Sequence, residues 1–185
     1  MNTFKQLAAA AALGLASLAT QATPVVIDVS GAKSINQFGE AGNTVWLIDI
    51  GANAVLNSLD WNVTLNATAP SSLFDMLVSF GSSSGLDAFD LAPDVIDGFS
   101  GAGSYTGSAD LTGLGLSVGA DGLLRLEFSE YTKDFANGVV EGQWASGTLT
   151  FDVTAAAVPE PGSAALALLG LGLVRLRLRR ASTAR

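Results

Sequence analysis

The sequence contains neither cysteine nor histidine among its 185 residues. Without cysteine the fold can form no disulfide bond, so its stability must come from the packing of its core. Without either residue the chain lacks the usual zinc ligands and the imidazole base of Ser-His and Cys-His relays. These absences exclude the usual zinc sites and the commonest nucleophilic hydrolases.

Basic residues are also scarce in the central region. The whole chain has 9 basic and 17 acidic residues, but Lys5 and five C-terminal arginines account for most of the basic ones. Residues 23–158 carry only Lys33, Arg125 and Lys133 against 16 acidic residues, a net charge near −13. Such a field repels phosphate backbones and attracts cations, so we expect no binding to nucleic acid.

The amino terminus has the pattern of a signal peptide, which we assign to residues 1–22. Lys5 precedes an Ala/Leu-rich run at 7–18 that is too short to span a membrane. Thr20-Gln21-Ala22 places small residues three and one positions before a cut. We therefore expect signal peptidase to cleave after Ala22, with Ala19 as the alternative, and the protein to be exported.

Residues 23–154 are predicted to form one all-β domain. Apolar and polar residues alternate, as in half-buried strands, at 59–66, 124–129 and 148–153. More continuous apolar runs predict further strands at 25–29, 44–50 and 73–80, with a weaker one at 114–118. Many short strands with glycine-rich turns indicate an antiparallel β-sandwich of jelly-roll type. Gly98–Gly122, rich in glycine and serine, could form a long mobile connection.

The C-terminal segment, residues 159–185, has three parts in a fixed order after a short spacer at 155–158. It begins with Pro159-Glu160-Pro161, continues with an uncharged apolar run from Gly162 to Val174, and ends in a basic tail. The tail alternates leucines with Arg175, Arg177, Arg179 and Arg180. As a helix, residues 162–178 would span about 25 Å, slightly less than a bilayer core of about 30 Å. Arginines favour the cytoplasmic side, which predicts a transmembrane helix with the domain outside. The alternative is an amphipathic helix packed on the domain.

At these residues the chain resembles the PEP-CTERM sorting signal of bacterial exported proteins, over Val158 to Arg180. In that family a membrane-embedded cysteine protease, exosortase, is thought to cut near the motif and release the protein or transfer it to the cell surface. The resemblance implies signal peptidase and exosortase as partners and the bacterial inner membrane as a transient anchor. It also implies a final place at the cell surface or in an exopolysaccharide matrix, as in biofilms. The short apolar run and the leucines between the arginines depart from the family pattern.

The densest acidic cluster comprises Asp87, Asp90, Asp94 and Asp97. Carboxylate oxygens suit Ca²⁺, although the spacing matches no EF-hand loop. The alternative is a solvated acidic loop above apolar side chains, which would be Leu86, Phe89, Val95, Ile96 and Phe99.

Exposed aromatic residues would suit glycan binding. Trp144, in the glycine-rich stretch GQWASG, is the best candidate for stacking on a sugar, whereas Trp61 lies on the apolar face of its predicted strand.

A hydrolase with two opposed carboxylates would need a signature that none of the acidic residues carries. The prediction is a non-enzymatic exported surface or matrix protein without catalytic residues. The alternatives are a glycan- or calcium-binding module and, behind it, an extracellular hydrolase.

Overall fold

The structure is a computed structural model that describes residues 22–93, 96–156 and 170. Within these residues the chain forms short 3-10 helices and strands in this order: β1 (Ala22–Asp28), β2 (Lys33–Ser34), β3 (Thr44–Asp49), β4 (Val55–Ala67), η1 (Leu73–Asp75), β5 (Met76–Ser82), β6 (Phe89–Leu91), β7 (Gly101–Asp110), η2 (Thr112–Leu114), β8 (Leu123–Glu130) and β9 (Gly142–Thr154).

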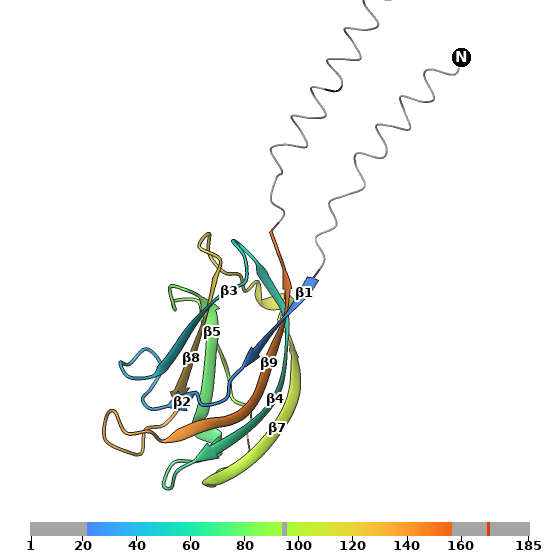
Figure 1. Ribbon diagram of the computed structural model, residues 1–185. Coiled ribbons are helices and arrows are strands. Elements are labelled where there is room, and N and C mark those ends of the chain that lie inside the picture. The colour runs from blue at the N-terminus through green and yellow to red at the C-terminus, as the bar shows by residue number, and fades with distance from the viewer. Residues whose placement is uncertain (1–21, 94–95, 157–169, 171–185) are drawn as a thin grey trace, which may run out of the picture.

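The strands form two antiparallel sheets that face each other (Figure 1). The first sheet has the order β1-β9-β4-β7, with β2 also paired to β9, and the second has the order β3-β8-β5-β6. The pairs are nested along the chain, because β1 pairs with β9, β3 with β8, β4 with β7 and β5 with β6. A long hairpin rolled into two sheets in this way is a jelly roll. The all-β antiparallel sandwich predicted from the sequence is confirmed.

The core lies between the sheets and is built from alternate residues of the strands. Phe128 on β8 meets Trp144 on β9 with ring centroids 5.1 Å apart, and Phe80 on β5 meets Phe151 on β9 at the same distance. Both contacts cross from one sheet to the other, in the edge-on geometry that aromatic rings favour. All the fully buried apolar residues of the described chain lie between Ile27 and Val153, so the domain closes its core within its own strands.

The glycine-rich stretch that the sequence suggested as a mobile connection is instead the edge strand β7. Gly103 and Gly107 lie at positions of β7 that face the core, and they leave room there for the rings of Tyr105 and Trp61. A Cβ on Gly107 would lie 2.2 Å from the indole of Trp61, and one on Gly103 would lie 2.3 Å from the Tyr105 hydroxyl. Aromatic rings from β4 and β7 therefore cover the backbone where β7 has no side chains.

The weak strand predicted at 114–118 is also wrong. Thr112–Leu114 form the helix η2, and only Ser117 makes an isolated bridge, to Val55. Leu114, Leu116 and Val118 do alternate with Gly115 and Ser117, but Gly115 adopts a left-handed conformation (φ 64°) at the end of η2, which interrupts an extended strand.

Both ends of the domain leave the sandwich side by side. Ala22, at the start of β1, pairs with Thr154, at the end of β9 (top of Figure 1). We call this the terminal end; it also carries the loops at 50–54, 83–88 and 111–122. The opposite, far end carries the segments 29–43 (with β2), 68–75 (with η1), 92–93, 96–100 and 131–141.

Apart from Ala22 and Gly170, the residues of the predicted signal helix and transmembrane helix lie outside those described. Within the described part of the chain, no helix is long and apolar enough to cross a membrane.

Candidate functional site

Of the residues predicted to be cleaved or to direct sorting, only Ala22 is described, and it lies at the terminal end. Ala22 is exposed and stands at the first position of β1. The motif Pro159-Glu160-Pro161 and the basic residues Arg175, Arg177, Arg179 and Arg180 lie outside the described residues. Cleavage after Ala22 and the roles of the motif and the tail therefore stay predictions, and the described structure supplies the platform from which these segments start.

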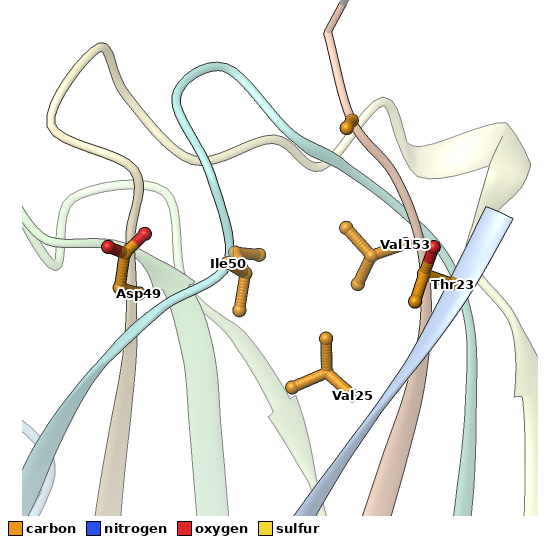
Figure 2. A pocket seen from close by; sticks show the side chains of 6 residues that line it. Thr23, Val25, Asp49, Ile50 and Val153 are labelled. Carbon is orange, nitrogen blue, oxygen red and sulfur yellow. The ribbon is translucent and has the colours of Figure 1, made fainter. Parts of the chain in front are cut away.

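A cavity of about 340 Å³ opens at the terminal end, between β1 and β9 on one side and the end of β3 on the other (Figure 2). Its walls are mainly apolar and come from Val25, Ile50 and Val153. Asp49 also lines it, and its carboxylate accepts a hydrogen bond from the N–H of Gly51 at 3.0 Å. The cavity is at the small end of the range for ligand sites and offers few polar groups to orient a ligand.

The three described members of the predicted calcium site, Asp87, Asp90 and Asp97, do not come together at one place. Asp87 lies in the loop before β6, where its carboxylate accepts a hydrogen bond from the Ser82 hydroxyl at 2.6 Å. This hydrogen bond lowers the pKa of Asp87 and keeps the group ionised. Asp94 lies outside the described residues.

The other two acidic residues are held by separate partners. Asp90, on β6, accepts a hydrogen bond from the Ser79 hydroxyl at 2.5 Å, and Asp97 accepts one from the Tyr105 hydroxyl at 2.8 Å. In residues 22–93 and 96–156, no group of three acidic side chains is placed to hold a metal ion. Calcium binding by the four aspartates stays a prediction, since one of the four is not described.

Three of the apolar residues expected beneath this acidic loop are instead turned to solvent, whereas Phe89 packs against Phe80 with ring centroids 5.6 Å apart and Val95 lies outside the described residues. Leu86 is 93 % exposed, Ile96 is 84 % exposed and Phe99 is 56 % exposed. The sandwich core is already filled by residues of the long strands, so these side chains of the connecting loops have no interior to enter.

Trp144 is fully buried, so the prediction that it stacks on a glycan is wrong. The reason is a β-bulge in β9, where Thr64 pairs with Ser146 but the next residue of β4, Leu65, pairs with Trp144. The extra residue, Ala145, reverses the alternation along β9. Leu149 and Trp144 therefore both point into the core although their positions differ by an odd number.

A buried polar cluster at the far end had no counterpart in the sequence predictions. Glu130, the last residue of β8, is 1 % exposed, and its carboxyl accepts a hydrogen bond from the Ser71 hydroxyl at 3.3 Å. Burial, together with the negative charges of Glu141 and Asp75, raises the pKa of Glu130 to about 8. The group therefore carries its proton at neutral pH, unlike an ordinary glutamate.

Glu141 anchors the neighbouring loop at 131–141. Its carboxylate accepts hydrogen bonds from the N–H groups of Asp134 at 2.9 Å and Phe135 at 3.0 Å. Lys133 lies 3.7 Å from the same carboxylate and donates a hydrogen bond to the carbonyl of Ile35 at 2.7 Å. The hydrogen bond from Lys133 to Ile35 therefore ties the β8–β9 loop to the loop that follows β2.

A second buried carboxylate holds the β2–β3 loop against the outer face of the second sheet. Glu127 accepts hydrogen bonds from the N–H of Gly39 at 2.8 Å and from the amide of Asn43 at 2.7 Å, and it pairs with Arg125. The Arg125 guanidinium lies 5.6 Å from the centre of the Phe38 ring.

These clusters have the geometry of structural anchors. Glu127, Glu130 and Glu141 are all covered, so none of them faces a cleft that a substrate could enter. A protonated carboxyl beside ionised ones suits acid–base chemistry only where a substrate can reach it. Burial of a carboxyl at the end of β8 depends on which loops fold over it, and no spacing in the sequence signals that.

Comparison with known proteins identifies one segment. Residues 157–181 match the family model described as the PEP-CTERM protein-sorting motif. The resemblance seen in the sequence is confirmed, and the match begins three residues after β9 ends. No curated protein matches the chain.

Two similar solved structures come from infectious bursal disease virus. The VP2 subviral particle has 10 % identity and a TM-score of 0.37, and the structure of the Gx strain has 15 % identity and a TM-score of 0.35. Each match covers 77 % of this chain and 34 % of the viral chain, so this chain spans about a third of their length.

Proposed function

We propose that this chain is an exported, non-enzymatic protein of the bacterial cell surface or extracellular matrix, sorted through its C-terminal signal. The match of residues 157–181 to the PEP-CTERM motif carries the proposal, because that motif supports export and sorting by exosortase. Signal peptidase removes residues 1–22, and residues 159–185 serve as a transient anchor in the inner membrane with the domain outside.

The fold is compatible with removal of that anchor. The last core residue, Val153, and the end of β9 at Thr154 come before the matched segment. A cut near Pro159-Glu160-Pro161 would therefore leave every strand and every core side chain of the described residues in place. It would also remove the five C-terminal arginines and leave a strongly acidic domain, which favours solubility outside the cell.

The sorting step is tested by mass spectrometry of the C-terminal peptide of the mature protein from its host. We expect peptides that end near Glu160, with Arg175–Arg185 missing, while Glu160→Gln should leave the intact precursor in the membrane. Asp60→Asn is the matched control, since it makes the same change at an exposed position of β4. Recovery of Arg175–Arg185 on mature surface protein would refute processing.

A second candidate function is the binding of a neutral polysaccharide. The supporting observation is the outer face of the first sheet, where hydroxyl and amide side chains stand in register on three adjacent strands. We call it the polar face; its hydroxyl and amide residues are Ser104, Thr106, Ser108, Asn62, Thr64, Asn66, Ser146, Thr148 and Thr150. The acidic Asp60 lies on the same face, paired with Ser108 and Thr150. Thr106, Asn62 and Thr148 form one row across the strands. Such rows offer donors and acceptors at the spacing of the strands, about 4.8 Å.

This candidate is tested by native gels cast with the exopolysaccharide of the host. We expect retardation of the domain that the double variant Asn62→Ala/Thr106→Ala weakens and that Thr132→Ala, on the exposed β8–β9 loop, leaves unchanged. Equal mobility of the unaltered domain in gels with and without polysaccharide would exclude it.

A further inference from the structure

The terminal end of the sandwich carries exposed leucines on two of its loops. Leu86, in the loop at 83–88, is 93 % exposed, and Leu114, in the loop at 111–122, is 49 % exposed. The remaining residues of these loops are mostly Gly, Ser and Ala, and neither loop contains Lys or Arg. Two leucines thus expose apolar surface to solvent at the same end of the domain.

The two loops are held in place relative to each other. The Ser83 hydroxyl donates a hydrogen bond to the Asp121 carboxylate at 2.5 Å, which links the loop at 83–88 to the loop at 111–122. Gly85 and Gly115 adopt positive φ angles of 70° and 64°, which glycine tolerates best. Leu86 and Leu114 thus each stand beside a glycine turn, in loops that are bridged at Ser83 and Asp121.

The charges at the bases of these loops are carboxylates, apart from the Arg125 guanidinium, which lies beside Gly85 and is paired with Glu127. The carboxylates concerned are Asp49, Asp87, Asp110 and Asp121. Each accepts a hydrogen bond from its surroundings; Asp110, for example, accepts one from the N–H of Thr112 at 2.9 Å. Hydrogen bonds from the Thr112 and Ser83 hydroxyls lower the pKa of Asp110 and Asp121, so both stay ionised. The loops can contact an apolar surface, but the charges behind them repel an anionic one.

The position of the domain's first and last strand residues decides what the terminal end of the sandwich faces. Thr154, paired with Ala22 at the terminal end, is eight residues before Gly162, the first residue of the apolar run. Eight extended residues span at most about 28 Å. β9 alone, with 13 residues, is about 43 Å long. An anchor that begins at Gly162 therefore keeps the terminal end within about 28 Å of the membrane, whereas the far end can lie about 43 Å farther away.

We infer that the terminal end is a membrane-docking surface, on which Leu86 and Leu114 enter the lipid interface while the C-terminal segment anchors the chain. The inference rests on the proposed sorting function. The partner is the lipid bilayer itself, and the contact holds the processing motif close to the membrane surface. Docking ends when the anchor is cut, because two leucines without a tether bind a bilayer only weakly.

The absence of cysteine gives this inference a clean test. The variants Leu86→Cys and Leu114→Cys each create a single labelling site, and Val139→Cys, 41 % exposed at the far end, is the matched control. Each full chain is labelled with an environment-sensitive fluorophore and reconstituted into phosphatidylethanolamine/phosphatidylglycerol vesicles that contain spin-labelled quencher lipids. Quenching at positions 86 and 114 should be at least about twofold stronger than at 139, since interfacial side chains lie about 5–10 Å inside the headgroup boundary. Raising the phosphatidylglycerol fraction at low salt should weaken it.

Each other outcome overturns the inference in a distinct way. Equal quenching at all three positions would mean that the domain does not dock by its terminal end, whether it stays in water or lies flat. A chain that fails to float with the vesicles would lack the proposed anchor, and the sorting proposal would fall together with the docking surface. Normal C-terminal processing combined with unquenched labels would leave the sorting proposal intact and refute docking alone.

Discussion

Replacing Glu130 by glutamine should remove most of the pH dependence of stability between pH 4.5 and pH 8. The Glu130 carboxyl is buried at the end of β8, close to the charges of Glu141 and Asp75, and its pKa is about 8 in the folded domain against an ordinary 4.5. Between these values the folded protein holds one proton that the unfolded chain has released. Stability therefore falls as pH rises through this window, by up to about 1.4 kcal/mol per pH unit.

The size of the effect follows from the two pKa values. A rise from 4.5 to about 8 corresponds to a loss on the order of 5 kcal/mol across the window, as an upper bound. Glutamine resembles the protonated carboxyl, because its oxygen can accept the Ser71 hydrogen bond and its amide can donate to the buried Ser34 hydroxyl, which lacks a hydrogen-bond partner in the described structure. The variant should match the unaltered domain within about 1 kcal/mol at pH 5 and exceed it by several kcal/mol at pH 8.

Urea unfolding followed by tryptophan fluorescence measures this difference on residues 22–156, which contain every described strand. Unfolding curves at pH 5, 6.5 and 8 are compared for the unaltered domain, Glu130→Gln and the exposed control Asp60→Asn. Hydrogen bonds from neighbouring hydroxyls lower the pKa of Asp28, Asp110 and Asp121, so these groups titrate below the window. Parallel stability profiles for Glu130→Gln and the unaltered domain from pH 5 to pH 8 would refute the reasoning.

Three further predictions concern the bulged strand and the acidic loop. Gly147→Ala should destabilise the domain by about 3 kcal/mol in the same urea assay, because a Cβ there would lie 2.1 Å from the Asn62 carbonyl oxygen and the residue has a φ of +115°. Trp144→Ala should cost about 3–5 kcal/mol, and Trp144→Phe clearly less, since the buried indole N–H has no hydrogen-bond partner in the described structure; equal costs would contradict the packing role. If the aspartates bind Ca²⁺, added calcium should raise the Tm of the domain and Asp90→Asn should abolish the rise; an unchanged Tm would exclude a calcium site.

The alternation of apolar and polar residues along the sequence was sufficient to predict most of the strands. Leu59, Val63 and Leu65 alternate with polar residues, and all three are buried on β4 as their period requires. The pattern failed for β7, whose inward positions are largely glycine. There the apolar surface is supplied by Trp61 from the neighbouring strand, which is a contact between residues far apart in the chain.

Trp144 shows a second limit. Its position relative to Leu149 and Phe151 places it on the solvent side of a regular strand, and only the inserted Ala145 turns it inward. A bulge depends on how β9 pairs with β4, so the residues of β9 alone do not reveal it. The surface that remains a candidate for glycan binding is therefore the polar face, which three strands form, and not Trp144.

By itself, the sequence determined the features that depend on composition and local order. These are the absence of disulfides, the acidity of the domain, the alternation that makes strands and the Pro-Glu-Pro segment with its apolar run and arginines. Only the tertiary structure decided which side chains are buried, because burial depends on partners brought together from distant parts of the chain. It placed Trp144 in the core, gave Glu130 its raised pKa, and set the first residue of β1 and the last residue of β9 at the same end of the sandwich as the loops of Leu86 and Leu114.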